Sequence, residues 1–581
     1  MGEGRPEGSF VMPKVQTCTE RIHSSGRWRR FTRGLPALPL LIAGLVILPV
    51  AVVLWTLLTP TPAVWEHLWA TLLPEITRNT MVLLIGVGAG TLILGTGLAW
   101  LTVAYRFPGH AVFDWLLLLP LAVPTYIMGF VYMATFDCAG PVQSALRGWF
   151  GSAIWFPEIR SGGGAVLVMT LVLYPYVYLL ARAAFHEQSG NTFEAARAMG
   201  YSRLQSFFRL AIPLARPSIA AGVTLALMEA LTDFATVRFF NFPTLSDGII
   251  RVWHGMMDLR AATELAGVLV LFALVVILFE RWVRGRARYS QKGGRSPGIG
   301  RVRFSGWGGW AAAGVCALVL AVAFVLPVAQ LALWTVREAA HMPPGALAIY
   351  WELAGNSLIL SGLATATAIV LAVVVANGVH MGGGRLARFT ARLATMGYAV
   401  PGAVIAVGVL VPLSAFDHAL NDLVEQWRGV TIGLLLTGSV VGLIYAYVVR
   451  FMAVAYNSVE SSLDKITPNI AMAARSLGAS PRRLLWRIHL PLIAPGLLAG
   501  ATLVFVDVMK ELPITMMLRP FGYDTLAIWV WQMAAESLWA GAALPALTIV
   551  LVGILPVILL MRIGTRSESE SRGGAHGPQL T

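Results

Sequence analysis

One polar, arginine-bearing block of about two dozen residues occurs twice in this chain, at positions 278 apart. The first copy runs from Glu194 to Pro217, and the second runs from Met472 to Pro495. Both copies contain Ala-Ala-Arg, a glycine three residues after the arginine, a serine two residues further on, and Pro-Leu-x-x-Pro. Since both copies lie in otherwise apolar sequence, we infer a tandem duplication in which each half performs the same task once.

The block predicts two short helices separated by a turn. Gly200 and Gly478 can adopt a positive φ and end the first helix. Ser202 and Ser480 are then the natural N-caps of the second helix, and Gln205 completes a capping box in the first copy. Arginines follow on the second helix, which suits it to a membrane surface or to a groove in a partner. A plain amphipathic connector would explain one copy, but it explains two copies in register less well.

The composition is that of a polytopic membrane protein. Of 581 residues, 57% are hydrophobic and only 12% are charged. The net charge of +14 raises the question of a nucleic-acid partner, but the basic residues lie in loops between apolar runs, as membrane orientation requires. We therefore expect a lipid bilayer and no nucleic acid as partner. Three scattered cysteines and ten histidines without a close pair give no reason to assign metal ligands.

Twelve apolar runs are long enough to cross a membrane. They are 36–58, 80–104, 111–135, 164–185, 214–235 and 262–282 in the first half, and 309–334, 355–377, 391–413, 431–456, 491–509 and 541–562 in the second. The sequence thus predicts an all-α fold of two tandem six-helix halves. The predicted parts are a cytoplasmic segment 1–34, a first transmembrane domain 35–282, a linker 283–308, a second transmembrane domain 309–563 and a cytoplasmic tail 564–581.

The orientation follows from the basic residues. With both termini in the cytoplasm, most of the 43 lysines and arginines fall in cytoplasmic segments, and so do both copies of the block. Because each half has an even number of spans, both insert the same way up and are related by an axis along the membrane normal. Further pairs support the repeat: Asn79 with Asn356 and Pro124 with Pro401, each 277 apart. We expect a pathway where the two halves meet.

Two pairs of acids interrupt the apolar runs. Glu229 and Asp233 are four residues apart and share a helical face, and Asp507 and Glu511 repeat this spacing in the second half. Acids within a membrane are costly and usually face a polar cavity or a partner. They are candidates for a gate or for transient ligands of a hard cation, which prefers carboxylate oxygen. The alternative is structural: an ion pair with Lys510, or a cap where the helix ends before a proline.

The block resembles the cytoplasmic signature loop of ABC importer permeases, which a pair of ATPase subunits drives. The matching positions are Glu194, Ala195, Ala196, Gly200, Pro213 and Pro217 in the first copy and Ala473, Ala474, Gly478, Pro491 and Pro495 in the second. Met472 replaces the signature acid, which weakens any ion pair made there. The resemblance implies the type I importer permease fold and two copies of an ABC ATPase on the cytoplasmic side. The chain has no phosphate-binding Gly-x-x-x-x-Gly-Lys-Ser/Thr loop, so we expect no cofactor and no enzymatic activity here, with ATP and Mg bound by the ATPase.

Two further segments, 232–240 and 510–526, are similar to the fused, two-half permeases of ferric-iron importers. That similarity implies a bacterial inner-membrane protein that receives iron from a periplasmic binding protein. Fused permeases for thiamine and for 2-aminoethylphosphonate have the same layout, so both substrates stay open. An ion-coupled secondary transporter, with acids that carry protons, is an alternative of another class, and a membrane scaffold is a third. The duplicated cytoplasmic block favours the ATP-driven class, because a self-powered carrier has no use for it.

Overall fold

The computed structural model describes residues 37–151, 155–285, 301–304, 306–341, 345–382 and 385–573. The predicted N-terminal segment 1–34, most of the linker and the end of the tail lie outside these residues. Within them the fold is helical, apart from one parallel pair of two-residue strands, β1 (Tyr105–Arg106) and β2 (Val302–Arg303). This pair joins the end of the linker to the first half.

In the described part of the chain, eleven helices are long and apolar enough to cross a membrane, and a bent pair raises the number to twelve. The spans of the first half are α2 (Ala37–Leu58), α4 (Leu73–Ala104), the bent pair, α8 (Gly162–Glu187), α11 (Ile212–Thr232) and α14 (Leu259–Arg284). Those of the second half are α15 and α16 (Trp307–Leu320, Leu326–Ala339), α17 (Ala346–Gly382), α19 (Gly402–Arg428), α20 (Val440–Leu463), α23 (Leu490–Met509) and α26 (Trp539–Gly573). The prediction of an all-α fold with two six-helix halves is confirmed.

Shorter elements connect these spans. In the first half they are α3 (Pro62–Thr71), α5 (His110–Leu116), η2 (Leu119–Ala122), α6 (Thr125–Phe136), α7 (Pro141–Phe150), α9 (Gly190–Ala198), α10 (Arg203–Ser206), η3 (Phe207–Ala211), α12 (Ala235–Phe239) and α13 (Leu245–Gly255). In the second half they are η4 (Ala321–Val325), α18 (Arg385–Ala394), η5 (Met396–Ala399), α21 (Pro468–Ser476), α22 (Pro481–Leu484), η6 (Leu485–His489), α24 (Pro513–Leu518) and α25 (Leu526–Ala535).

Three predicted spans differ from the structure. The third, predicted as one span over 111–135 with a kink at Pro124, is bent by 90° between η2 and α6, where Pro124 is the N-cap residue of α6. The ninth, predicted at 391–413, becomes α18 and then α19, because the residue before Pro401 is extended (φ −110°, ψ 130°) and ends the preceding turn. The tenth begins at Val440 and not at 431, because Gly433 and Gly438 have positive φ values of 77° and 68°.

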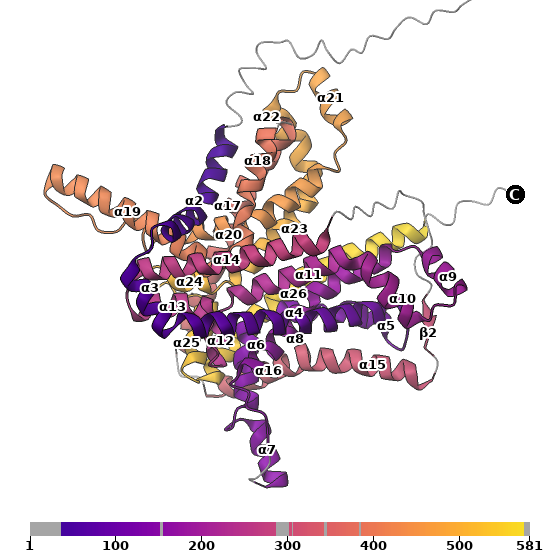
Figure 1. Ribbon diagram of the computed structural model, residues 1–581. Helices are drawn as coiled ribbons and strands as arrows, with labels where there is room; N and C mark the ends of the chain where they lie inside the picture. The colour runs from indigo at the N-terminus through magenta and orange to yellow at the C-terminus, as the bar shows by residue number, and fades with distance from the viewer. Residues whose placement is uncertain are drawn as a thin grey trace, which may run out of the picture.

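The packing repeats in the two halves. Helices α4, α8 and α11 pack on one another in the first half, as α17, α20 and α23 do in the second. The first helix of each half crosses over: α2 packs on α18 and α19, and α16 contacts α6. The last helices also reach across, since α14 packs on α19 and α26 packs on η2. Figure 1 shows the two bundles diverging toward the ends that carry α9 and α21.

In each bundle, at the end away from α9 or α21, an asparagine side chain anchors a short helix. The Asn79 amide donates to the carbonyl oxygen of Pro243, and the Asn356 amide donates to that of Asp524, both at 3.0 Å. In each half the hydroxyl of the next residue accepts a hydrogen bond from the first backbone N–H of the short helix, at 3.0 and 2.9 Å. The paired asparagines therefore fix α13 and α25 against α4 and α17, which frames the space between the halves.

Candidate functional site

Both copies of the duplicated block form a short helix, a glycine turn and a capped second helix. Gly200 ends α9 with φ 87°, and Gly478 ends α21 with φ 80°, as predicted. No heavy atom lies within 4 Å of where a Cβ would stand on either glycine. Backbone conformation, and not lack of space, is therefore the reason for glycine at both turns.

The second helix of each copy is capped as the sequence predicts. Ser202 and Gln205 form a complete capping box at the start of α10, and the Ser480 hydroxyl accepts from the Arg483 N–H at 3.3 Å. A π-helical turn, η3 or η6, then leads into the fifth span of each half. Pro213 and Pro491 are the second residues of α11 and α23 and directly follow these π-helical turns, inside the continuous helices Arg203–Thr232 and Arg482–Met509. Pro217 and Pro495 lie one turn further on.

The two blocks present similar surfaces. Glu194 and Ala195 on α9 are exposed, and so is Ala473 on α21, whereas Ala196 and Ala474 are buried. The residue before each turn glycine is an exposed apolar side chain: Met199 is 71% exposed and Leu477 is 87% exposed. Sequence reasoning did not single out these two side chains, although their apolar type beside a polar turn is a usable signal. Each block thus offers a polar helix with an apolar tip.

All four candidate acids line one cavity of about 220 Å³ between the halves. Its walls come from η2, α6, α8, α11 and α12 of the first half and from η5, α20, α23 and α24 of the second. The charged side chains on its lining are Glu229, Asp233, Arg450, Asp507, Lys510 and Glu511. The structure therefore brings together the acids that lie 278 positions apart in the chain.

On the first-half side Asp233 has neutral hydrogen-bond partners. The Asp233 carboxylate accepts a hydrogen bond from the Thr236 N–H at 2.8 Å and another from the Thr236 hydroxyl, so it caps α12. The Thr125 side chain lies close to this carboxylate. Glu229, half-buried one turn earlier on α11, forms no close ion pair with any residue that the structure describes, but it interacts electrostatically with Arg450 and Lys510 of the second half. The first half thus contributes two acids and no base to the lining.

On the second-half side each acid has a basic partner. Lys510 Nζ lies 2.9 Å from Asp507 Oδ1, and Arg450 Nη1 lies 3.5 Å from Glu511 Oε1. Glu511 Oε1 also accepts from the Ile514 N–H at 3.2 Å, which caps α24. The ion pairs and caps of the structural interpretation are therefore present, and the same acids face the cavity. Lys510 pairs with Asp507, while the partner of Glu511 is Arg450 on another helix.

Sequence reasoning missed Arg450 and Gly402. A Cβ on Gly402 would stand 2.1 Å from Arg450 Nη1 and 2.8 Å from Glu511 Oε1, so any other residue at the start of α19 would displace the ends of these two side chains. Arg450 itself is 8% exposed. A lone arginine within the predicted tenth span was the available signal, because an ionised group at membrane depth needs a partner.

The cavity has an excess of negative charge and many oxygen atoms. Its lining holds four carboxylates against one guanidinium and one ammonium group, with the hydroxyls of Tyr176 and Tyr398 nearby. Among the residues described, no three His, Cys, Asp or Glu side chains are close enough together to hold a metal ion. The lining is suited to attracting a cation, without a closed ligand set that would retain one.

Paired bundles around a charged cavity, with a repeated polar block at the diverging ends, define a permease subunit of a transporter. The chain belongs to the family of binding-protein-dependent transport system inner membrane components, whose model matches residues 91–289 and 368–568, one match in each half. It is thus an ABC importer permease, a multi-pass protein of the inner membrane and not an enzyme.

Known relatives cover one or both halves. The chain is 27% identical to the Fe(3+)-transport system permease protein FbpB 2 of Haemophilus influenzae, over 86% of this chain and 91% of the relative. It is 24% identical to the probable ABC transporter permease protein y4fN of Sinorhizobium fredii, over 88% and 89%. The sulfate transport system permease protein CysT of Salmonella typhimurium is 26% identical, over 43% of this chain and 90% of the relative. The fused two-half arrangement is therefore shared with the first two.

Proposed function

We propose that the chain forms the translocation pathway for ferric iron, delivered by a periplasmic binding protein and driven by two copies of an ABC ATPase. The observation that carries the proposal is the charge of the cavity between the halves: four carboxylates face two cationic groups. A trivalent cation is hard and prefers oxygen ligands, which this lining supplies. Sulfate, for which one relative is named as a transport permease, is an anion that this excess charge would repel.

The two sides of the cavity suggest different tasks in moving a cation. Among the described residues of the first half, no basic side chain lines the cavity beside Glu229 and Asp233, so we assign the attraction of the substrate to these two acids. Asp507 and Glu511 are already paired with Lys510 and Arg450. Such pairs keep the total attraction moderate, and a permeation site must be strong enough to fill yet weak enough to empty.

The duplicated block supplies the proposed coupling to ATP hydrolysis. In this proposal α9 and α21 each dock one ATPase copy, with Met199 and Leu477 as exposed apolar contacts. The ATPase holds ATP and Mg, and this chain contributes no cofactor. The basic residues favour the placement of both blocks and both termini in the cytoplasm. Coupling by two separate subunits also makes a proton-carrying role for the acids unnecessary.

Neutralising the two first-half acids tests the iron pathway. In the variant Glu229→Gln with Asp233→Asn, size is kept and Asn still caps α12, so membrane abundance should stay normal. Iron uptake by the assembled importer should fall about tenfold, because the excess charge of the lining is removed. The matched control is Glu66→Gln with Glu75→Gln, which removes two exposed acids outside the cavity. Normal uptake by the first variant at normal abundance would overturn the proposal.

Competition distinguishes iron from the other substrates of fused permeases. An excess of thiamine or of 2-aminoethylphosphonate should leave iron uptake unchanged if the pathway serves ferric iron. Thiamine is cationic, so uptake of thiamine that depends on Glu229 would reassign the pathway to an organic cation. Phosphonate uptake that is insensitive to both acids would instead contradict the electrostatic basis of the proposal.

A further inference from the structure

A second pocket, of about 670 Å³, opens beside the strand pair at the end of the first half. Its basic lining residues are Arg106, His110, Arg301 and Arg303, and its aromatic ones are Phe107, Trp115 and Phe304. Tyr105 and Phe304 stack at 4.2 Å between ring centroids, and the Phe304 N–H donates to the Arg106 carbonyl at 3.0 Å. Residues that are almost 200 positions apart in the chain are thereby held at one pocket.

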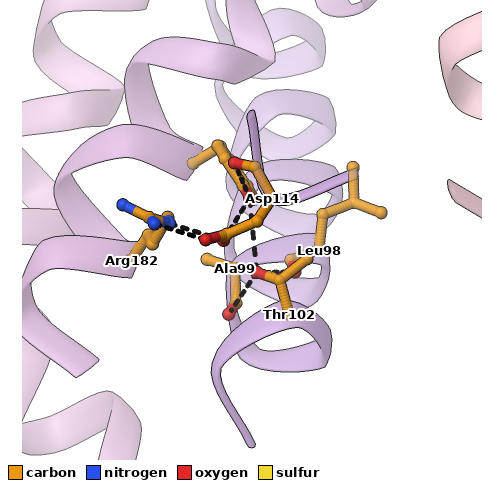
Figure 2. A network of polar contacts seen from close by, with 6 residues as sticks. Leu98, Ala99, Thr102, Asp114 and Arg182 are labelled. Carbon is orange, nitrogen blue, oxygen red and sulfur yellow. Dashed lines mark hydrogen bonds and ion pairs between the residues drawn. The ribbon is translucent and has the colours of Figure 1, made fainter. Parts of the chain in front are cut away.

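The one acid on this lining is already neutralised from inside the fold. Arg182 Nε lies 2.6 Å from Asp114 Oδ1, and Arg182 Nη2 contacts Asp114 Oδ2 (Figure 2). The Tyr178 hydroxyl adds a hydrogen bond to the same carboxylate at 3.2 Å. No carboxylate among the described residues pairs with Arg106, Arg301 or Arg303. Three guanidinium groups therefore surround an open pocket without a compensating charge.

Two exposed tryptophans follow the pocket in the chain and indicate where the membrane would meet water. Trp307 and Trp310 follow its last residue at the start of α15 and are 90% and 67% exposed. Exposed tryptophans at the start of a spanning helix are typical of the headgroup region. Tyr105 and Val302 of the strand pair also face Glu194 of α9 across a smaller pocket. The basic pocket is thus at the same end of the molecule as the first duplicated block.

We infer that this pocket binds the phosphate of an anionic phospholipid headgroup. Guanidinium groups bind phosphate oxygens with two parallel hydrogen bonds, and basic pockets between spanning helices are suited to anionic lipid headgroups. The aromatic walls and the interfacial tryptophans select a lipid over a soluble phosphate, because they place the arginines beside the acyl chains. A bound headgroup bridges Arg106 of the first half and Arg301 and Arg303 of the linker, and it fastens the linker strand beside α9.

Lipid binding to the purified full-length chain in detergent tests this inference. Native mass spectrometry and a fluorescent-lipid titration with phosphatidylglycerol should show a bound lipid, with phosphatidylcholine at least about tenfold weaker. The variant Arg106→Gln, Arg301→Gln, Arg303→Gln should lose that preference. The charge-matched control is Arg385→Gln, Arg388→Gln, Arg392→Gln on α18, where the three arginines are exposed and do not line this pocket. The control should keep the preference for phosphatidylglycerol.

Three outcomes would overturn the inference. One is equal affinity for the two lipids in the unmodified chain. Another is an equal loss in the control variant, which would mean general attraction to basic surfaces. The last is displacement of phosphatidylglycerol by inorganic phosphate at a matched concentration, which would mean a site for a soluble anion. Thermal unfolding supplies an independent readout: phosphatidylglycerol should raise the unfolding temperature of the unmodified and control chains, but not of the pocket variant.

Discussion

The two halves line the cavity with acids at matching positions but surround these acids with different neighbours. Asp233 and Glu511, 278 positions apart, both cap the short helix that follows them. In the first half the residue after the repeated proline, Pro124, is Thr125, which lies close to Asp233. In the second half Gly402 follows Pro401. The shared backbone role is helix capping, and the charge around it differs.

Two further positions explain that difference. Aligned on the repeated Tyr-x-Tyr, 271 positions apart, Leu179 in the first half corresponds to Arg450 in the second. At the offset of 278, Thr232 corresponds to Lys510. The second half thus has two cations where the first has neutral residues, together with a glycine that makes room for one of them. Duplication supplied a symmetric frame, and three substitutions made one side ion-paired and left the other side acidic.

The largest expected effect is on folding, at the ion pair unique to the second half. Glu511→Gln leaves Arg450 buried without its partner, which should lower stability by about 3–5 kcal/mol. Asp233→Asn, at the matching position, should cost less than about 1 kcal/mol because Asn also caps helices. Membrane abundance and thermal unfolding in detergent would measure both.

A second substitution separates charge from packing at this site. Adding Arg450→Leu to Glu511→Gln removes both charges of the pair, so no buried charge is left without a partner and abundance should return. If Glu511→Gln alone is as stable as Asp233→Asn, the ion pair has no structural role and the two sides do not differ as described.

We expect the second-largest effect on stability from substitutions at the residue that follows the repeated proline. Gly402→Ala places a methyl group against Arg450 and Glu511, and such overpacking costs about 1–3 kcal/mol. Thr125→Ala removes a hydroxyl close to Asp233 and should cost at most about 1 kcal/mol. Unfolding temperatures of the two variants, measured side by side, give the ranking. A tolerated alanine at Gly402 would show that Arg450 can move away freely.

Substitution of the two turn glycines compares the two coupling blocks. Gly200→Val and Gly478→Val each force a branched residue into positive φ, which costs about 1–2 kcal/mol of local strain. We expect both to lower transport relative to ATP hydrolysis, and Gly200→Val to do so more, because only the first block retains the signature acid, Glu194. Co-purification with the ATPase and uptake assays would measure this effect. Unchanged uptake in the double variant would refute the role of both turns.

The smallest difference in stability between the halves should appear at the serine N-caps of the second helix in each block. Ser202→Ala breaks a reciprocal capping box, whereas Ser480→Ala removes a single hydrogen bond. The first should cost about 1 kcal/mol and the second about half as much. Hydrogen exchange of the backbone around α10 and α22 would detect both losses. Equal protection in the two variants would mean that the capping box adds nothing over one serine.

The sequence by itself determined the features that repeat along the chain. The apolar runs, the duplicated block, the turn glycines and their serine caps follow from local backbone preferences and from the cost of placing polar groups in lipid. Such preferences act within a few residues, so a pattern in one dimension is enough to find them. The same locality explains the errors at the third, ninth and tenth spans, where hydropathy continues through a proline or paired glycines but the helix does not.

Only the tertiary structure decided which charges meet. The four acids were visible as residues in spans, yet the pairing of Glu511 with Arg450, 61 positions away, depends on how α20 packs against the end of α23. The need for Gly402 appears only once that guanidinium is in place. The basic pocket likewise depends on a strand from the linker pairing with residues of the first half. Electrostatic interactions act through space, and their partners are set by the folded packing and not by distance along the chain.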